Sequence, residues 1–128
     1  MQESKNKKNV GKGKIAEQEA IDYLKTKNYT ILDRNSYHDH AELDIVAIDK
    51  MVKQVVFVEV KSQKSDFFGA PELQITPQKI RHLYRAAELW LWQHRMHNEA
   101  CRFDVIAISE VKGKKKVVHY ENAFVMGR

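Results

Sequence analysis

The sequence predicts an α/β fold in which helices flank a mixed central sheet. Helical and strand-like patterns follow one another in the order helix, three strands, helix, strand, and a hairpin comes last. The chain has 128 residues, of which 43% are hydrophobic and 30% are charged, and this is typical of one domain with a substantial core. We therefore predict a single domain over residues 14–128, preceded by a flexible basic N-terminal arm over residues 1–13.

The first helix is predicted to begin near Lys14. Residues 1–14 contain five lysines, one glutamate and two glycines and have no apolar period, so they fit either a solvated tail or an arm that contacts phosphates. Apolar residues then recur at helical spacing from Ile15 to Leu24. This amphipathic pattern predicts a helix that ends around Lys27.

Three strands are predicted next, at residues 29–32, 43–48 and 55–60. The third strand is nearly continuous in apolar residues, as expected of a central strand that is covered on both faces. Residues 62–75 form a loop that is long for a compact domain, and this length suggests a functional role.

The second helix opens at Thr76-Pro77, which fits an N-cap followed by proline at the first helical position. The helix is expected to continue to about His97, which would put His94 and His97 one turn apart as surface histidines. A strand at residues 102–109 and a hairpin around Gly113 complete the predicted fold.

Two acids on neighbouring strands are the first candidates for chemistry. If the strands at 43–48 and 55–60 pair as an unbulged hairpin, Asp44 lies opposite Glu59, and Glu42 lies opposite Lys61. Opposed residues share a face of the sheet, with Cβ atoms about 4.5–5.5 Å apart. Two carboxylates at that distance repel unless one is protonated or a cation lies between them. Mg²⁺ takes oxygen ligands of this kind, so the pair predicts a metal site.

Two further residues complete the candidate site. Lys61 projects from the same face as Glu59, where its ammonium group could position or activate a water molecule. Glu17 lies at the edge of the apolar stripe of the first helix and could lean over the sheet as another ligand. A structural interpretation also fits: Glu17 would complement the helix dipole, Glu42 and Lys61 would form an ion pair, and a salt bridge would satisfy Glu59.

The spacing of these residues resembles that of a known superfamily. Asp44, followed after fourteen residues by Glu59-Val60-Lys61, resembles the PD-(D/E)xK signature of restriction-endonuclease-like nucleases. Further blocks in the same order resemble the YraN-type uncharacterised bacterial family, which is related in fold to Holliday-junction resolvases. These blocks are Ala16-Glu17 through Tyr23-Leu24, Arg34-Asn35, Ala41-Glu42-Leu43-Asp44, Phe68-Gly69-Ala70-Pro71, Thr76-Pro77 with Lys79, and Arg102-Phe103-Asp104-Val105.

The resemblance covers about residues 11–109. It implies a restriction-endonuclease-like core (αβββαβ) and a phosphodiesterase site that uses Mg²⁺, with Mn²⁺ as an alternative. Glu17, Asp44, Glu59 and Lys61 take the positions of the catalytic residues, and Asp44, Glu59 and Glu17 those of the metal ligands. The chain departs from the family at three positions: Ala16 and Ala41 replace glycine, and Gln63 replaces an arginine that could contact phosphate.

Charge and cysteine content bound the partners. The net charge of +5 and the pI near 9.3 favour an anionic partner, and nucleic acid is favoured over a membrane. The single cysteine excludes an intramolecular disulfide and fits a cytoplasmic location. A homodimer would match the symmetric junction cutters of the same fold. The basic candidates for contacts with nucleic acid are Lys12, Lys14, Lys79 and Arg81.

Together these observations predict a Mg²⁺-dependent endonuclease that acts on DNA, and branched or structured DNA fits the resemblance. Two alternatives remain open. One is a nucleic-acid-binding protein that keeps the nuclease fold but cleaves little or nothing. The other is a small interaction or assembly subunit whose acids form structural ion pairs.

Overall fold

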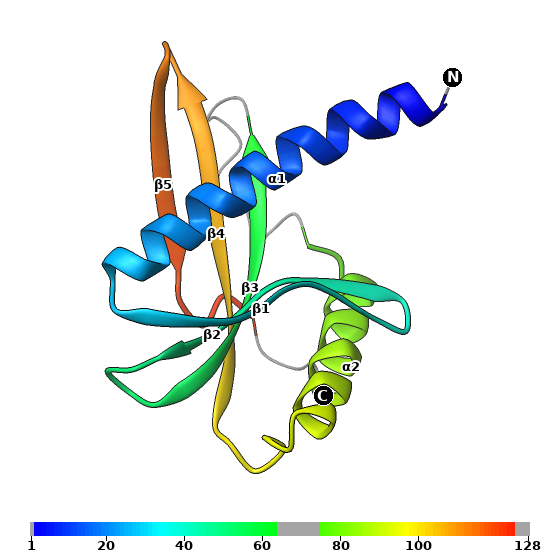
Figure 1. Ribbon diagram of the computed structural model, residues 1–128, viewed down its shortest axis with the longest axis vertical. Coiled ribbons are helices and arrows are strands. Elements are labelled where there is room, and N and C mark those ends of the chain that lie inside the picture. Colours follow the sequence, from blue (N-terminus) through cyan, green and yellow to red (C-terminus); the bar gives the residue numbers. More distant parts are fainter. Residues whose placement is uncertain (1, 64–74, 125–128) are drawn as a thin grey trace.

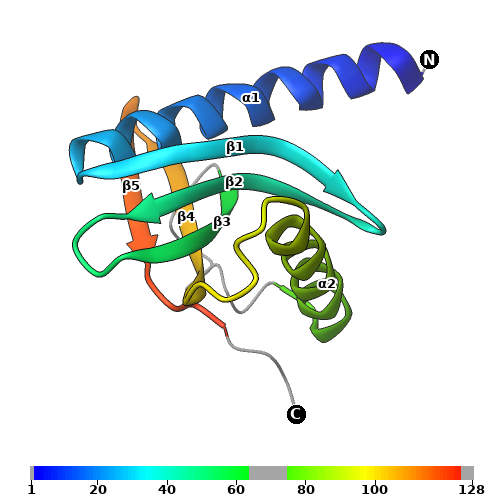
Figure 2. The same cartoon turned by 60° about the horizontal axis from the view of Figure 1, so that its bottom comes forward.

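The computed structural model describes residues 2–63 and 75–124. Its elements are α1 (Gln2–Thr26), β1 (Tyr29–His38), β2 (Ala41–Asp49), β3 (Gln54–Gln63), α2 (Pro77–Gln93), β4 (Cys101–Val111) and β5 (Lys114–Tyr120). The strands form one twisted sheet, with α1 along one face and α2 against the other (Figures 1 and 2). Neither helix is apolar over enough of its length to cross a membrane within these described ranges.

The sheet is mixed because one of its strand pairs is parallel. The strands lie in chain order, β1-β2-β3-β4-β5, and all neighbours are antiparallel except β3 and β4. A parallel pair needs a crossover connection, and α2 lies in that connection. The predicted αβββαβ order with a mixed sheet flanked by helices is therefore confirmed, and it is consistent with a restriction-endonuclease-like core.

Two apolar layers hold the sheet between the helices. Alternate residues of β3 and β4 point to opposite faces, so each face supplies its own layer. The layer under α1 includes Ala20, Leu24, Val56 and Ile106. The layer under α2 includes Phe57, Leu83, Trp90 and Phe103. Trp90 is only 1% exposed, and its indole N–H donates to Asp33 Oδ2 at 2.9 Å, so this large side chain is both packed and hydrogen-bonded.

The register of β2 and β3 is the one that the sequence predicted. The paired residues run from Asp49 and Gln54 beside the turn to Ile45 and Val58, and the next residues in this register are Asp44 and Glu59. The ladder stops just before them. β2 continues alongside β1, and the two strands extend as a twisted hairpin past α2 (Figure 2). The candidate acids thus lie where β2 and β3 separate.

The boundaries of both helices differ from the prediction. α1 begins at Gln2, well before Lys14; a helix extends at little further cost once it is nucleated, and it needs no apolar period to do so. The predicted role of residues 1–13 as a basic arm remains a prediction. α2 ends at Gln93 because His94 caps it and Arg95 takes a φ of 56°. The prediction that His94 and His97 lie on one helix was therefore wrong.

A buried ionic network ties β4 to its neighbours. The Arg102 guanidinium group lies 2.9 Å from Asp104 Oδ1 and 3.1 Å from Asp49 Oδ2. Asp104 is fully buried and also binds His119 Nε2 at 2.7 Å and the Asn122 backbone N–H at 2.9 Å. Burial alone would raise the pKa of Asp104, but the hydrogen bonds from His119 and Arg102 outweigh burial and lower it. Asp104 therefore has a structural role, since it holds Arg102, His119 and the Asn122 backbone together.

Candidate functional site

Asp44 lies at the point where the β2–β3 ladder ends. Its Oδ2 atom accepts the Val60 backbone N–H at 2.9 Å, which would otherwise lose its strand partner there. A side chain thus satisfies a backbone donor that the separation of the strands leaves unpaired. This hydrogen bond fixes the Asp44 side chain at the point where β2 and β3 separate.

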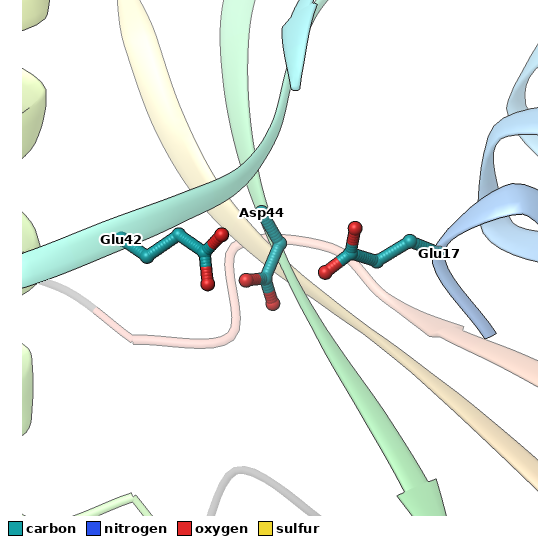
Figure 3. A group of neighbouring side chains, drawn as sticks. All are labelled: Glu17, Glu42 and Asp44. Carbon is teal, nitrogen blue, oxygen red and sulfur yellow. The ribbon is translucent and has the colours of Figure 1, made fainter. Parts of the chain in front are cut away.

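Three carboxylates converge at this point. Glu17, Glu42 and Asp44 each offer an oxygen atom, and these atoms all lie within 4.8 Å of one another. Glu17 comes from α1, while Glu42 and Asp44 are two residues apart on β2 and therefore share a face (Figure 3). Glu17 is buried, and the other two are half-buried. We call these three residues the acid cluster.

Asn35 of β1 connects two members of the acid cluster. Its Nδ2 atom donates to Glu17 Oε1 at 2.6 Å and to Glu42 Oε2 at 3.0 Å. Because an amide nitrogen carries two hydrogens, it can serve both carboxylates at once. The sequence marked Asn35 only as part of a family-like block and assigned it no role. Its position between Arg34 and Ser36 in a polar stretch contains no signal of these contacts.

Glu59 is held by two lysines from different elements. Its Oε2 atom lies 3.8 Å from Lys61 Nζ, two residues further along β3, and 3.8 Å from Lys79 Nζ on α2. The Glu59 side chain is 8% exposed, while the Lys61 and Lys79 side chains are 31% and 42% exposed. Both ammonium groups can therefore also face a ligand in solution. Lys61 pairs with Glu59 and not with Glu42, the partner that the structural interpretation of the sequence offered.

The surroundings of the acids disfavour negative charge. Burial and the nearby charge of Glu59 raise the pKa of Asp44 to about 9, although the hydrogen bond from the Val60 N–H acts in the opposite direction. Burial also raises the pKa of Glu17, as does Glu42, against the effect of the Asn35 hydrogen bond. A hollow with apolar walls adjoins Asp44 and Glu59, and Phe57, Leu83 and Phe103 line it.

The donor set fits a hard divalent cation. Clustered carboxylates at low exposure either take up protons or share a cation, and Mg²⁺ and Mn²⁺ prefer oxygen ligands of this type. The residues that could hold such an ion are Glu17, Glu42 and Asp44. The sequence predicted Glu17, Asp44 and Glu59; the structure adds Glu42 to the group, and Glu59 lies beside it with the lysines.

The structure brings most of the predicted site residues to one place. Glu17, Asp44, Glu59 and Lys61 all lie around the end of the β2–β3 ladder, and Lys79 joins them from α2. Two other basic candidates, Lys14 on α1 and Arg81 on α2, are exposed, and among the described residues neither has a contact that places it in the site. The side chains of Lys12 and Gln63, and the block Phe68-Gly69-Ala70-Pro71, lie outside the described residues.

Known proteins resemble the chain over most of its length. The model of the family described as "Uncharacterised protein family UPF0102" matches residues 16–108. A UPF0102 protein of Geotalea daltonii is 41% identical over 113 residues, covering 88% of this chain and 87% of that protein. One of Mycolicibacterium gilvum is 39% identical (88% and 92% covered), and one of Bifidobacterium longum is 42% identical (88% and 91% covered). The YraN-type resemblance is thereby confirmed.

Proposed function

This chain belongs to the uncharacterised protein family UPF0102, and we propose that it hydrolyses phosphodiester bonds of DNA with the help of a divalent cation. The observation that carries the proposal is the meeting of two oppositely charged groups at one end of the sheet. The acid cluster gathers three carboxylates within 4.8 Å. Directly beside it, Lys61 and Lys79 flank Glu59.

The acid cluster is the part that would hold Mg²⁺ or Mn²⁺. When bound there, the ion would supply charge neutralisation on a phosphate oxygen and a more acidic water molecule. Glu17 comes from α1, which packs on the sheet, and Glu42 and Asp44 come from β2, which is one of its strands. The chain therefore offers the ligands in a nearly fixed arrangement, which lowers the entropy lost on binding.

The two lysines are the part that would meet the substrate. Both Nζ atoms lie 3.8 Å from the same Glu59 oxygen and are partly exposed. An ammonium group in this place attracts a phosphodiester and stabilises negative charge that develops on it during hydrolysis. Lys61, the lysine of the ExK sequence, is the candidate for holding the attacking water. Lys79 is the candidate for holding the phosphate.

DNA as the substrate follows from charge and from the family resemblance. The net charge of the chain is +5, which favours approach of a polyanion. A restriction-endonuclease-like core that resembles junction resolvases suggests branched DNA. A nucleic-acid-binding protein without cleavage is the main alternative, because Glu59 also forms two ion pairs that can be purely structural.

A cleavage assay tests the proposal. The full chain is incubated with end-labelled linear, flapped and four-way DNA in Mg²⁺, in Mn²⁺ or in chelator, beside Asp44→Asn and Lys61→Ala. We expect metal-dependent cleavage of at least one substrate and a loss of at least about 100-fold in each variant. Asp39→Asn and Lys50→Ala are the controls. They change exposed residues in the turns at the two ends of β2, and they should cleave like the wild type.

Two outcomes overturn the proposed activity, and a third overturns the assigned site. If the wild type cuts no substrate but binds DNA with a steep salt dependence, the chain is a binding module with a nuclease fold. If it neither cuts nor binds, the acids and lysines serve structure or assembly. Cleavage that survives Asp44→Asn undiminished would also refute the assigned site.

A further inference from the structure

We propose that Asn35 is a positioning residue, which holds the Glu17 and Glu42 carboxylates in the arrangement that a divalent cation requires. This inference rests on the proposed metal site. It goes beyond that proposal because Asn35 would not contact the metal or the substrate. It would act only through the two carboxylates that its amide group binds.

The position of Asn35 in the sheet explains how it reaches both acids. Its neighbours Arg34 and Ser36 pair with Ile45 and Leu43 of β2, so Asn35 lies level with Asp44. α1 packs over this part of the sheet and brings Glu17 to the same place. Asn35 therefore lies between the helix and β2, where one side chain can bind an acid from each.

The backbone at Asn35 restricts which residues can stand there. Its φ is 52°, a left-handed conformation that asparagine and glycine adopt far more readily than most other residues. Glycine would fit the backbone but has no donor. Aspartate would have the same shape but would add a fourth carboxylate. Asparagine combines the backbone tolerance with two N–H groups and no charge.

The hydrogen bonds leave both carboxylates available as ligands. Each carboxylate has two oxygens, and Asn35 binds Oε1 of Glu17 and Oε2 of Glu42. One contact to each side chain fixes its rotamer while the other oxygen can still bind a cation. Hydrogen-bonding partners of metal ligands typically change metal affinity by about 10–100-fold when they are removed.

Metal affinity separates positioning from a merely structural role. The full chain, Asn35→Gly and Asn35→Asp are titrated with Mn²⁺ in a calorimeter, and their melting temperatures are measured with Mn²⁺ and with chelator. Asn28→Gly and Asn28→Asp are the matched controls, because Asn28 also has a positive φ, of 70°, and is exposed at the end of α1.

We expect Asn35→Gly to raise the Kd for Mn²⁺ by about 10–100-fold, while Asn28→Gly leaves it unchanged. In chelator, Asn35→Asp should have a lower melting temperature than Asn28→Asp, because the fourth carboxylate is repelled by the acid cluster. Mn²⁺ should raise the melting temperature of Asn35→Asp more than that of Asn28→Asp, because the bound cation relieves this repulsion. Asn35→Asp also keeps the side-chain shape, so this comparison holds if Asn35→Gly does not fold.

The results distinguish this inference from the proposed function. If the wild type binds Mn²⁺ and both Asn35 variants bind it like their Asn28 counterparts, the positioning role is refuted and the nuclease proposal stands. If the wild type binds Mn²⁺, the Asn35→Gly affinity falls and no DNA is cut, the positioning role stands and the nuclease proposal fails. If the wild type binds no Mn²⁺, both are refuted.

Discussion

Replacing Asp44 by asparagine should stabilise the metal-free protein although it removes a residue of the acid cluster. Asp44 accepts the Val60 N–H, and its raised pKa reflects burial and the nearby charge of Glu59. Asparagine has the same shape as a protonated aspartate. Its oxygen can accept the Val60 N–H, and its amide can donate to Glu59, without the need to take up a proton.

The size of the effect follows from proton binding. The pKa of Asp44 is raised to about 9 in the folded protein, against about 3.9 in an unfolded chain. Between these values the native state binds a proton that the unfolded state lacks, so the stability of the wild type falls as the pH rises toward the folded pKa. A difference of one bound proton changes the free energy of unfolding by about 1.4 kcal/mol per pH unit, so the wild type should lose up to about 3 kcal/mol between pH 6 and pH 8.

Urea unfolding in the presence of a chelator measures this difference. The free energies of unfolding of the wild type and Asp44→Asn are compared at pH 6, 7 and 8. The advantage of the variant should widen with pH, by up to about 3 kcal/mol over this range. Asp22→Asn is the control, because Asp22 is an exposed acid of α1 that accepts a hydrogen bond from the neutral Gln18 side chain, and its difference from the wild type should not change with pH.

Parallel stability curves for wild type and Asp44→Asn would refute the reasoning. They would mean that folded and unfolded Asp44 bind the same number of protons in this range. The acid cluster would then be well solvated, and its carboxylates would carry their charge without a cation.

Three further predictions concern stability. Asp104→Asn should lower the free energy of unfolding at pH 7 by about 2–3 kcal/mol, measured in urea, because it removes the buried negative charge that Arg102 and His119 share, while Asp49 remains as a partner of Arg102. The lowered pKa of Asp104 means that the wild type loses this contribution as the pH falls below about 4. Thr76→Ala should cost about 1 kcal/mol, measured in the same way, because the Thr76 side chain accepts the Lys79 N–H at the start of α2; Thr76→Ser should keep most of that energy. Gly113→Ala should lower the melting temperature, because alanine is strained at the φ of 75° that Gly113 adopts. The added methyl group would meet no atom within 4 Å, so the effect would come from the backbone alone. An unchanged melting temperature would show that the turn relaxes.

The sequence predicts the sheet well because its determinants are local. The apolar run at 55–58 indicates a central strand, and the short turn before it sets the register of β2 and β3. In that register Asp44 and Glu59 come directly after the last pair, Ile45 and Val58. The hairpin around Gly113 is also recognisable from the sequence, because glycine readily adopts the positive φ that a two-residue hairpin turn requires. In the structure Lys112 and Gly113 both have positive φ.

The missing parts of the site depend on three-dimensional features that no short segment contains. A flat hairpin would put Glu42 opposite Lys61. Instead, β2 and β3 separate beyond the Ile45–Val58 pair, on the side away from their turn, and Glu42 meets Glu17 of α1. Asn35 has no charge or spacing to mark it. Lys79 was predicted to contact phosphate, yet its place beside Glu59 follows only from the packing of α2.

The order of the site residues along the chain has a consequence for folding kinetics. Glu17, Asn35, Glu42 and Asp44 all belong to α1 and the β1–β2 hairpin, whose contacts close short loops and can form early. Lys79 arrives only with the crossover that makes β3 and β4 parallel, which is a slower, non-local step. We therefore expect the acids to come together before Lys79 can pair with Glu59. A cation that binds the acids during folding should then speed folding as well as slow unfolding.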